Sequence, residues 1–285
     1  MKILKNILSV FVVFTLIISI ATVSFNADTF YGNGVYTFSK NGDDTITIEA
    51  YDATEGDMVI PEVIFGDTVV AIADLAFYDN DYIVTATFPE TLTSIGVSAF
   101  NYASNLTTVT IPEACTSVAK GAFQNCPSLT TVNINSDLTA ISDQMFYKCI
   151  SLETIVLPST VESIGKFAFS DCSSLKSVTI PKATTSIASN AFRNCSDVTI
   201  YGYAGSYAEE YAETYSIPFV ALIEYELGDV DLNERVDIKD ATLIQRYVAS
   251  LSSLTDEQLA VADVNEDGGV NVADATAIQR ALVEG

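Results

Sequence analysis

The chain has 285 residues and a formal net charge of −24 at pH 7, with 37 acidic residues against 13 basic ones. This charge argues against nucleic acids and anionic membranes as partners, because both are bound through basic patches. The chain has no His and no Trp, so the commonest general base, His-ligated zinc and the strongest sugar-stacking side chain are all excluded. The composition favours a soluble extracellular protein that binds divalent cations.

Residues 1–27 are predicted to be a secretory signal peptide. Lys2 and Lys5 precede an apolar run over 7–21, and cleavage is expected near position 24 or 27. The alternative is a retained membrane anchor, but a membrane-spanning helix needs about 20 apolar residues and this run is shorter. We therefore expect a secreted protein that has left the membrane after cleavage.

Residues 28–66 are predicted to form a β cap in front of a repeat array. Strand-like stretches over 35–39 and 45–50 flank a Lys-Asn-Gly-Asp-Asp turn, which predicts a hairpin. A cap is expected because an open array would expose its core and an unpaired strand edge.

Residues 67–199 contain six repeats with a period of 23 residues. Each repeat has a Phe at the same place, with a β-branched residue five positions before it and an apolar residue six positions after it. The six are Phe77, Phe100, Phe123, Phe146, Phe169 and Phe192. Leucine-rich repeats have periods of about 20–29 residues, and each coil places a short strand beside its neighbour's strand. The pattern predicts a mostly β solenoid with short helical turns.

A Pro closes four of the five repeat strands, at Pro89, Pro112, Pro158 and Pro181. The motifs over 92–100 (Leu-Thr-Ser-Ile-Gly-Val-Ser-Ala-Phe) and 161–172 resemble the BspA-type bacterial leucine-rich repeat, and the resemblance extends over about 55–200. It implies a curved solenoid for adhesion or protein binding, without a shared catalytic activity. The ligand of the repeat surface is left unknown, because its outward Thr, Ser and Asn residues also suit a solvated sheet.

Four of the five cysteines follow the period, namely Cys126, Cys149, Cys172 and Cys195. One interpretation is a metal ladder or stacked disulfides, because strands about 4.8 Å apart lie within disulfide reach. Ala103 occupies the same place in an earlier coil, which favours small buried side chains. Cys115 replaces the Leu or Val of other coils. We expect all five to be unpaired thiols.

Residues 200–224 break the period and are predicted to form a C-terminal cap and a short linker. A helix is expected over about 206–215, with Tyr207, Tyr211 and Tyr215 on one face. This row of tyrosines could bind sugars, but packing against the end of the solenoid is the favoured interpretation.

Two acidic loops lie 34 residues apart in the last segment, 225–285, and each is predicted to bind one Ca²⁺. Oxygen-bearing side chains stand at positions 1, 3, 5 and 12, and position 7 supplies a main-chain carbonyl, as in calcium loops. The expected ligands are Asp229, Asp231, Asn233, Arg235 (carbonyl) and Asp240 in the first loop, and Asp263, Asn265, Asp267, Gly269 (carbonyl) and Asp274 in the second. Glu234 stands at position 6, where Gly eases the turn, so the first site is expected to be the weaker.

A helix is predicted after each loop, and Thr255 and Gln258 predict a capping box for a short helix between the two units. This duplicated loop-then-helix pattern resembles a type I dockerin, a small all-α calcium-binding module. The resemblance implies attachment to a cohesin module of a scaffoldin. It also implies that the cohesin contacts are Ile238, Lys239, Thr242, Gln245 and Arg246 in the first copy, and Val272, Ala273, Thr276, Gln279 and Arg280 in the second. Because Thr, Gln and Arg recur, docking in one or in two orientations is left open.

We therefore expect a secreted, non-catalytic protein that docks onto a cohesin and displays its solenoid for protein or carbohydrate interaction, in the setting of polysaccharide degradation. The alternative is a glycoside hydrolase or another polysaccharide-degrading enzyme, because dockerins are usually attached to such enzymes. Against the alternative, the signal, caps, repeats and loops leave no span for a catalytic domain, and no motif places a pair of catalytic carboxylates.

Overall fold

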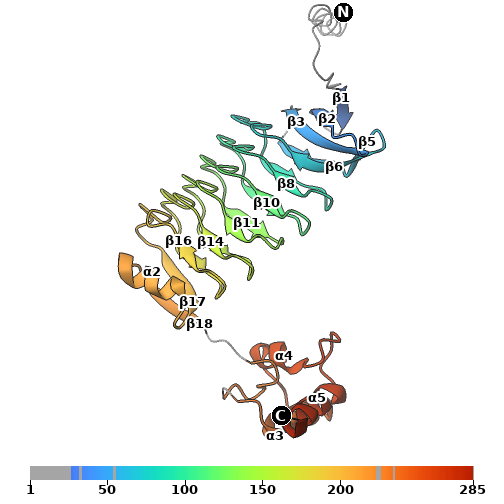
Figure 1. Cartoon of the computed structure of the whole chain (residues 1–285), viewed down its shortest axis with the longest axis vertical. Coiled ribbons are helices and arrows are strands. Elements are labelled where there is room, and N and C mark those ends of the chain that lie inside the picture. The colour runs from blue at the N-terminus through green and yellow to red at the C-terminus, as the bar shows by residue number, and fades with distance from the viewer. Residues whose placement is uncertain (1–26, 32–33, 54–55, 223–225, 234, 285) are drawn as a thin grey trace, which may run out of the picture. The chain divides into compact units, whose positions relative to one another are not determined.

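The computed structural model describes residues 27–31, 34–53, 56–222, 226–233 and 235–284 (Figure 1). The expected signal peptide lies outside the described residues except for Ala27. Contacts divide the chain into two units that meet at Phe219 and Val220, and each unit is described by itself. None of the helices in the described ranges combines the length and the apolar character needed to cross a membrane.

The first unit begins with a β cap whose hairpin matches the sequence expectation. The antiparallel strands β2 and β3 are paired across the Asn41–Asp44 turn, and β3 then runs parallel to β6, the first strand of the array. The cap strands are β1 (Ala27–Tyr31), β2 (Gly34–Lys40), β3 (Thr45–Ala53), β4 (Asp57–Val59) and β5 (Val63–Ile64), and the array begins with β6 (Asp67–Ile72). The cap hairpin thus covers one end of the solenoid, because β3 takes the free edge of β6.

Each coil of the solenoid contributes one longer and one shorter strand, and strands pair in parallel with a register of 23 residues for most pairs, such as Val132 with Val109. The longer strands are β7 (Thr85–Thr87), β9 (Thr108–Ile111), β11 (Thr131–Ile134), β13 (Thr154–Val156), β15 (Ser177–Thr179) and β17 (Thr199–Tyr203). The shorter strands are β8 (Ser94–Ile95), β10 (Ser117–Val118), β12 (Ala140–Ile141), β14 (Ser163–Ile164) and β16 (Ser186–Ile187). The strand orders are β11-β9-β7-β4, β13-β15-β17-β18, β12-β14-β16 and a larger sheet that ends β6-β8-β10.

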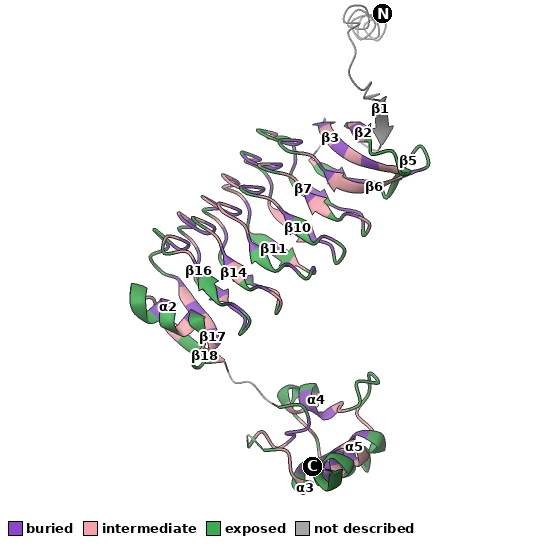
Figure 2. Cartoon of the chain, in the orientation of Figure 1, coloured by how far each residue is buried: buried purple, intermediate pink, exposed green. Residues whose placement is uncertain are grey.

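The repeat phenylalanines stack through the core of the solenoid, so that buried positions recur in every coil (Figure 2). Between Phe100 and Phe192 the ring centroids of successive coils lie 5.3, 5.8, 5.5 and 5.3 Å apart, and each pair is stacked. Stacked aromatic side chains bury large areas and add a favourable geometric term of about 0.5–1.5 kcal/mol per pair. The phenylalanines that recur every 23 residues in the sequence therefore form one continuous column of rings, called the aromatic column below.

All five cysteines are free and buried. The Sγ atoms of Cys126, Cys149 and Cys172 each lie 3.1 Å from the carbonyl oxygen of the Phe 26 residues earlier, and Cys195 lies 3.0 Å from that of Phe169. A thiol is small, apolar and a weak donor. Each of these Cys side chains therefore fills a small buried space, and its thiol donates to a carbonyl oxygen of the preceding coil. The methyl group of Ala103 fills the same space in an earlier coil but cannot donate.

The last helix of the first unit is α2 (Tyr207–Tyr215), and β18 (Phe219–Leu222) begins at the last residue of that unit. Ser206 caps α2 through its side chain, which accepts a hydrogen bond from the N–H of Glu209. Only one tyrosine of the expected face is buried: Tyr211 is 4% exposed, whereas Tyr207 and Tyr215 are 38% and 45% exposed. Tyr211 packs against Phe192 with ring centroids 6.0 Å apart, and α2 covers the last coil through this ring together with the buried Ala208 and Ala212.

The second unit contains three helices, α3 (Ile238–Val248), α4 (Asp256–Ala262) and α5 (Val272–Glu284). Its small core consists of Val230, Ala241, Ile244, Ala262, Ala275 and Ile278. The predicted capping box of α4 is present, with Thr255 and Gln258 bonded reciprocally. Six small or medium side chains make a thin core, and domains with such a core commonly need metals or disulfides for stability.

Candidate metal centre and partner-binding face

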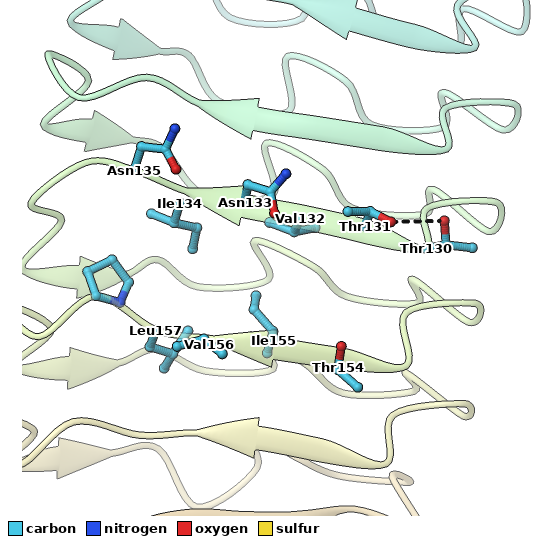
Figure 3. A pocket seen from close by; sticks show the side chains of 11 residues that line it. Thr130, Thr131, Val132, Asn133, Ile134, Asn135, Thr154, Ile155, Val156 and Leu157 are labelled. Atoms are coloured by element: carbon cyan, nitrogen blue, oxygen red, sulfur yellow. Dashed lines mark hydrogen bonds between the residues drawn. The ribbon is translucent and has the colours of Figure 1, made fainter. Parts of the chain in front are cut away.

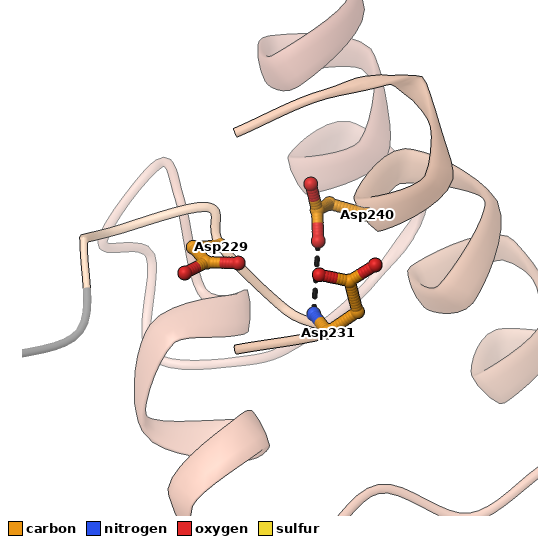
Figure 4. Close-up of side chains that lie close together, drawn as sticks. All are labelled: Asp229, Asp231 and Asp240. Carbon is orange, nitrogen blue, oxygen red and sulfur yellow. Dashed lines mark hydrogen bonds between the residues drawn. The ribbon is translucent and has the colours of Figure 1, made fainter. Parts of the chain in front are cut away.

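Three carboxylates converge in the first loop of the second unit (Figure 4). Asp229, Asp231 and Asp240 can each offer an oxygen, and these oxygens all lie within 4.8 Å of one another. Asp229 and Asp240 are fully buried. Within the described ranges, this is the one group of three acidic or cysteine side chains that meets this condition.

Backbone hydrogen bonds hold the loop around Asp240. Its Oδ1 accepts from the N–H of Asp231 at 2.8 Å, and its Oδ2 accepts from the N–H of Asp237 at 2.7 Å. The N–H of Asn233 donates to Oδ1 of Asp229 at 3.0 Å. Hydrogen bonds to the carboxylates of Asp229 and Asp240 therefore hold both ends of the loop.

The second loop has the same hydrogen bonds at positions 34 residues later in the chain. Asp274 accepts from the N–H of Asn265 at 3.1 Å and from the N–H of Asn271 at 2.8 Å, and Asp263 accepts from the N–H of Asp267 at 3.1 Å. The Nδ2 of Asn271 donates to the carbonyl oxygen of Gly269 at 2.8 Å, which is the predicted main-chain ligand. The two loops are thus built alike, although the second has Asn265 where the first has Asp231.

The residues of the first loop fit a calcium ion. Oδ1 of Asp231 is buried and has no hydrogen-bond partner, so this carboxylate oxygen is left for another ligand to satisfy. Three carboxylates this close repel one another unless a cation compensates their charge. An all-oxygen group of this kind suits the hard Ca²⁺ ion. Asn233 and Arg235 are exposed beside the group, and Glu234 lies outside the described residues.

Asp237 and Asn271, which stand at position 9 of the two loops, have a role at the start of the helices that the sequence did not reveal. Asp237 caps α3 by accepting from the N–H of Lys239 at 2.7 Å, and Asn271 accepts from the N–H of Ala273 at 2.8 Å in the same way. Both helices therefore begin before the position-12 aspartate rather than after it. An Asp or Asn three residues before an acidic side chain is a known N-cap pattern, which could have located these starts.

Gln258 also links elements in a way that the sequence did not reveal. Its Nε2 donates to the carbonyl oxygen of Val230 at 2.9 Å, which ties α4 to the first loop. The contact joins residues 28 positions apart, so no local pattern could predict it.

The residues that the resemblance assigns to cohesin contacts lie mainly on the surface. Those of the first copy, Ile238, Lys239, Thr242, Gln245 and Arg246, are all exposed. In the second copy Val272, Ala273 and Arg280 are exposed, and Thr276 and Gln279 are half-buried. A hollow of about 440 Å³ lies on the second copy, lined in part by Val272, Thr276 and Arg280. Ile238 and Val272 are each 55% exposed, a large apolar exposure at equivalent positions.

The two folds define a leucine-rich-repeat solenoid followed by a module of paired loop–helix units. Residues 70–199 match the family model of the BspA type leucine rich repeat region in six copies, and residues 227–283 match that of the dockerin type I domain. The chain therefore carries a BspA-type leucine-rich repeat region and a type I dockerin domain. Both resemblances and the predicted fold class are confirmed.

One solved structure supports the repeat fold, and a second is similar in sequence. The T. pallidum leucine-rich repeat protein TpLRR is 26% identical, with a TM-score of 0.57 over 76% of this chain and 94% of that one. A leucine-rich cell surface protein from Faecalibacterium prausnitzii A2-165 is 31% identical, with a TM-score of 0.46 over 62% of this chain and 54% of that one. No curated protein matches the chain in sequence. Type I dockerin domains bind calcium and cohesins, and neither domain class is catalytic.

Proposed function

We propose that this protein is a secreted, non-catalytic component that attaches through its calcium-loaded dockerin to a cohesin of a scaffoldin, in the setting of polysaccharide degradation. The solenoid is the displayed part and the second unit is the attachment device. The observation that carries the proposal is the convergence of Asp229, Asp231 and Asp240, two of them fully buried, with a buried and unpartnered oxygen on Asp231.

We propose further that the module binds two calcium ions, one in each loop. Asp240 and Asp274 accept equivalent pairs of backbone hydrogen bonds, so each loop is closed in the same way. Because the loops lead directly into α3 and α5, loss of either ion would release the first turn of the helix that carries the proposed cohesin contacts.

The cohesin contacts are proposed on the exposed faces of α3 and α5. Arg246 and Arg280 are exposed at equivalent positions, so each copy can offer the same cation to an acidic partner surface. A pull-down on an immobilised type I cohesin tests the proposal: the full chain should be retained in calcium and released by EGTA. The single variants Arg246→Ala and Arg280→Ala distinguish one docking orientation from two, because with two orientations only the double variant loses binding. Equal retention in calcium and in EGTA would refute the attachment role.

A further inference from the structure

The solenoid is interrupted at one junction between coils, on both strand faces. In the described chain β11 pairs with β9 and β13 pairs with β15, but β11 and β13 are not paired with each other. The shorter strands β10 and β12 are likewise not paired with each other, although β10 pairs with β8 and β12 pairs with β14. We call the place between β11 and β13 the open junction.

The opposite side of the same junction remains closed. The N–H groups of Gly121 and Phe123 donate to the carbonyl oxygens of Asp143 and Met145 at 2.9 and 3.0 Å, as in the other coils. The Phe123–Phe146 centroid distance of 5.8 Å is the longest of the four stacked pairs from Phe100 to Phe192. The two coils therefore separate as a wedge that opens toward the strands.

A side-chain hydroxyl group forms a hydrogen bond between the two separated coils. At regular junctions the N–H after the short strand donates directly to the preceding coil, as from Ala119 to Ile95 at 2.9 Å and from Gly165 to Ile141 at 2.8 Å. At the open junction the equivalent residue is Ser142, and its Oγ rather than its N–H donates to the carbonyl oxygen of Val118, at 2.5 Å. The side chain thus replaces a lost backbone bond.

The open junction coincides with a missing Pro, because β11 is the one strand among β7, β9, β11, β13 and β15 that no Pro closes. In the other coils a turn begins at the Pro, and its carbonyl oxygen accepts from the N–H three residues later at 3.0–3.2 Å: Pro89 from Leu92, Pro112 from Cys115, Pro158 from Val161 and Pro181 from Thr184. Asn135 stands at this place in the third coil, and residues 135–138 form no such turn. Ser136 is buried there, and its Oγ has no hydrogen-bond partner.

The open junction forms a groove of about 380 Å³, which lies between β11 and β13 (Figure 3). This volume is within the range of about 300–1,000 Å³ of ligand sites. Thr131, Asn133 and Asn135 stand on one wall and Thr154 and Val156 on the other. Because backbone groups alternate along a parallel ladder, the N–H and C=O groups of Val132 and Ile134 face across the gap toward those of Thr154 and Val156.

The lining of the groove decides which ligand fits. Its lining residues, all within the described part of the chain, include no charged side chain, so an ionic ligand finds no counter-charge. Each Asn amide can donate and accept, as can each Thr hydroxyl. Residues of β11 and β13 still approach within 8 Å, Cα to Cα, whereas an inserted strand needs about 10 Å, twice the normal strand spacing. The gap is too narrow for a peptide strand and admits single hydroxyl groups.

We propose that the open junction is a binding site for an uncharged oligosaccharide chain. Its hydroxyl groups would pair with the amides of Asn133 and Asn135 and with the free backbone edges of β11 and β13, while Val156, which is 68% exposed, packs on the carbohydrate ring. The inference deepens the proposed function, because it names the ligand class of the displayed solenoid.

Titration calorimetry of the full chain in calcium tests this proposal, with neutral hexasaccharides of glucose, xylose and mannose, anionic hexagalacturonate, and an uncharged Ser/Thr-rich peptide. At least one neutral hexasaccharide should bind, and Asn133→Ala should weaken binding by tenfold or more. Thr179→Ala, at the equivalent place on β15 with a closed junction, should change it less than twofold. Asn135→Pro, which restores the turn, should also abolish binding.

The proposal is overturned if no neutral hexasaccharide binds at millimolar concentration, if hexagalacturonate or the peptide binds as tightly, or if Asn133→Ala and Thr179→Ala behave alike. The surface change Asn133→Ala keeps the test independent of whether Asn135→Pro folds. Retention of the same preparation on an immobilised cohesin, measured in parallel, separates a failure of this site from a failure of dockerin attachment.

Discussion

The backbone N–H of Asp231 donates a 2.8 Å hydrogen bond to Oδ1 of Asp240, nine residues later in the first turn of α3. This bond closes the first loop and brings the two carboxylates to one place. The same relationship joins Asn265 to Asp274 in the second loop. Each position-12 aspartate is therefore both a proposed ligand and the residue that connects its loop to its helix.

Calcium stoichiometry follows from this arrangement. Native mass spectrometry should find two Ca²⁺ ions on the full chain, and one ion on Asp240→Asn and on Asp274→Asn, because each change removes a charged ligand from one loop. Asp256→Asn is the matched control, since Asp256 is exposed in the first turn of α4 and belongs to neither loop. Two ions on either loop variant would contradict the assignment of ligands.

The first site should be the weaker of the two, as the sequence predicts. Gly268, at position 6 of the second loop, has a φ of +89°, a conformation that costs an L-residue about 1 kcal/mol or more. Glu234 occupies this position in the first loop. Glu234→Gly should therefore raise the affinity of the first site about fivefold, and Gly268→Ala should lower that of the second.

Calcium titration of each variant in a background with the other loop inactivated measures these changes. Asp274→Asn provides that background for the first loop and Asp240→Asn for the second. Equal affinities of the two parent loops, or no gain from Glu234→Gly, would count against the strain at position 6.

Loss of one ring from the aromatic column should destabilise the whole solenoid. Phe169 is fully buried between Phe146 and Phe192, so Phe169→Ala should lower the free energy of unfolding by about 3–5 kcal/mol. Lys166→Ala, three residues earlier and exposed, should change it by less than about 0.5 kcal/mol. Urea unfolding followed by circular dichroism in excess calcium measures both, and similar values for the two variants would refute the role of the column.

The buried thiols should make the solenoid sensitive to alkaline pH. Burial raises the pKa of Cys126 to about 12 and those of Cys115 and Cys195 to about 11, from the ordinary value of 9.0. Above pH 9 the unfolded chain releases these protons while the folded chain keeps them. The stability that is fully present below pH 9 is therefore lost as the pH rises toward 11–12, by up to about 1.4 kcal/mol per pH unit for each thiol.

Urea unfolding between pH 8 and pH 9.5 measures the onset of this slope below the ordinary pKa of tyrosine, which is 10.0. Cys126→Ala should show a shallower slope of stability against pH, because it removes one titrating thiol. The variant should fold, because Ala103 already fills the equivalent position in an earlier coil. An unchanged slope in this variant would show that the thiols do not cause the pH dependence.

Much of the fold follows from spacing alone, because a residue that recurs every 23 positions must stack on itself in a solenoid. The same holds for the paired loops, where Asp229 and Asp240 are placed by a fixed loop length. The start of α3 was expected after Asp240, yet the helix begins at Ile238, because Asp237 serves as its N-cap. Tyr207 and Tyr215 were expected beside Tyr211 on the packed face, yet Tyr211 alone of the three is buried.

The open junction could not be predicted from the sequence, although the missing Pro at Asn135 is visible there. A single missing turn could have been absorbed within its own coil. Whether the missing turn separates both pairs of strands depends on how two whole coils pack, and this packing is not a local property of the sequence. A second local sign is Ser142, in a place that Gly or Ala occupies in the other coils.

If calcium in the paired loops makes the second unit the attachment device of the protein, cohesin binding should depend on Asp240 and Asp274. The most direct measurement is surface plasmon resonance of the full chain and of the Asp240→Asn, Asp274→Asn double variant on an immobilised type I cohesin, each in calcium and in EGTA. We expect tight binding of the parent chain in calcium alone, and at least a hundredfold weaker binding of the double variant in calcium. Binding of the double variant as tight as that of the parent chain would contradict this expectation.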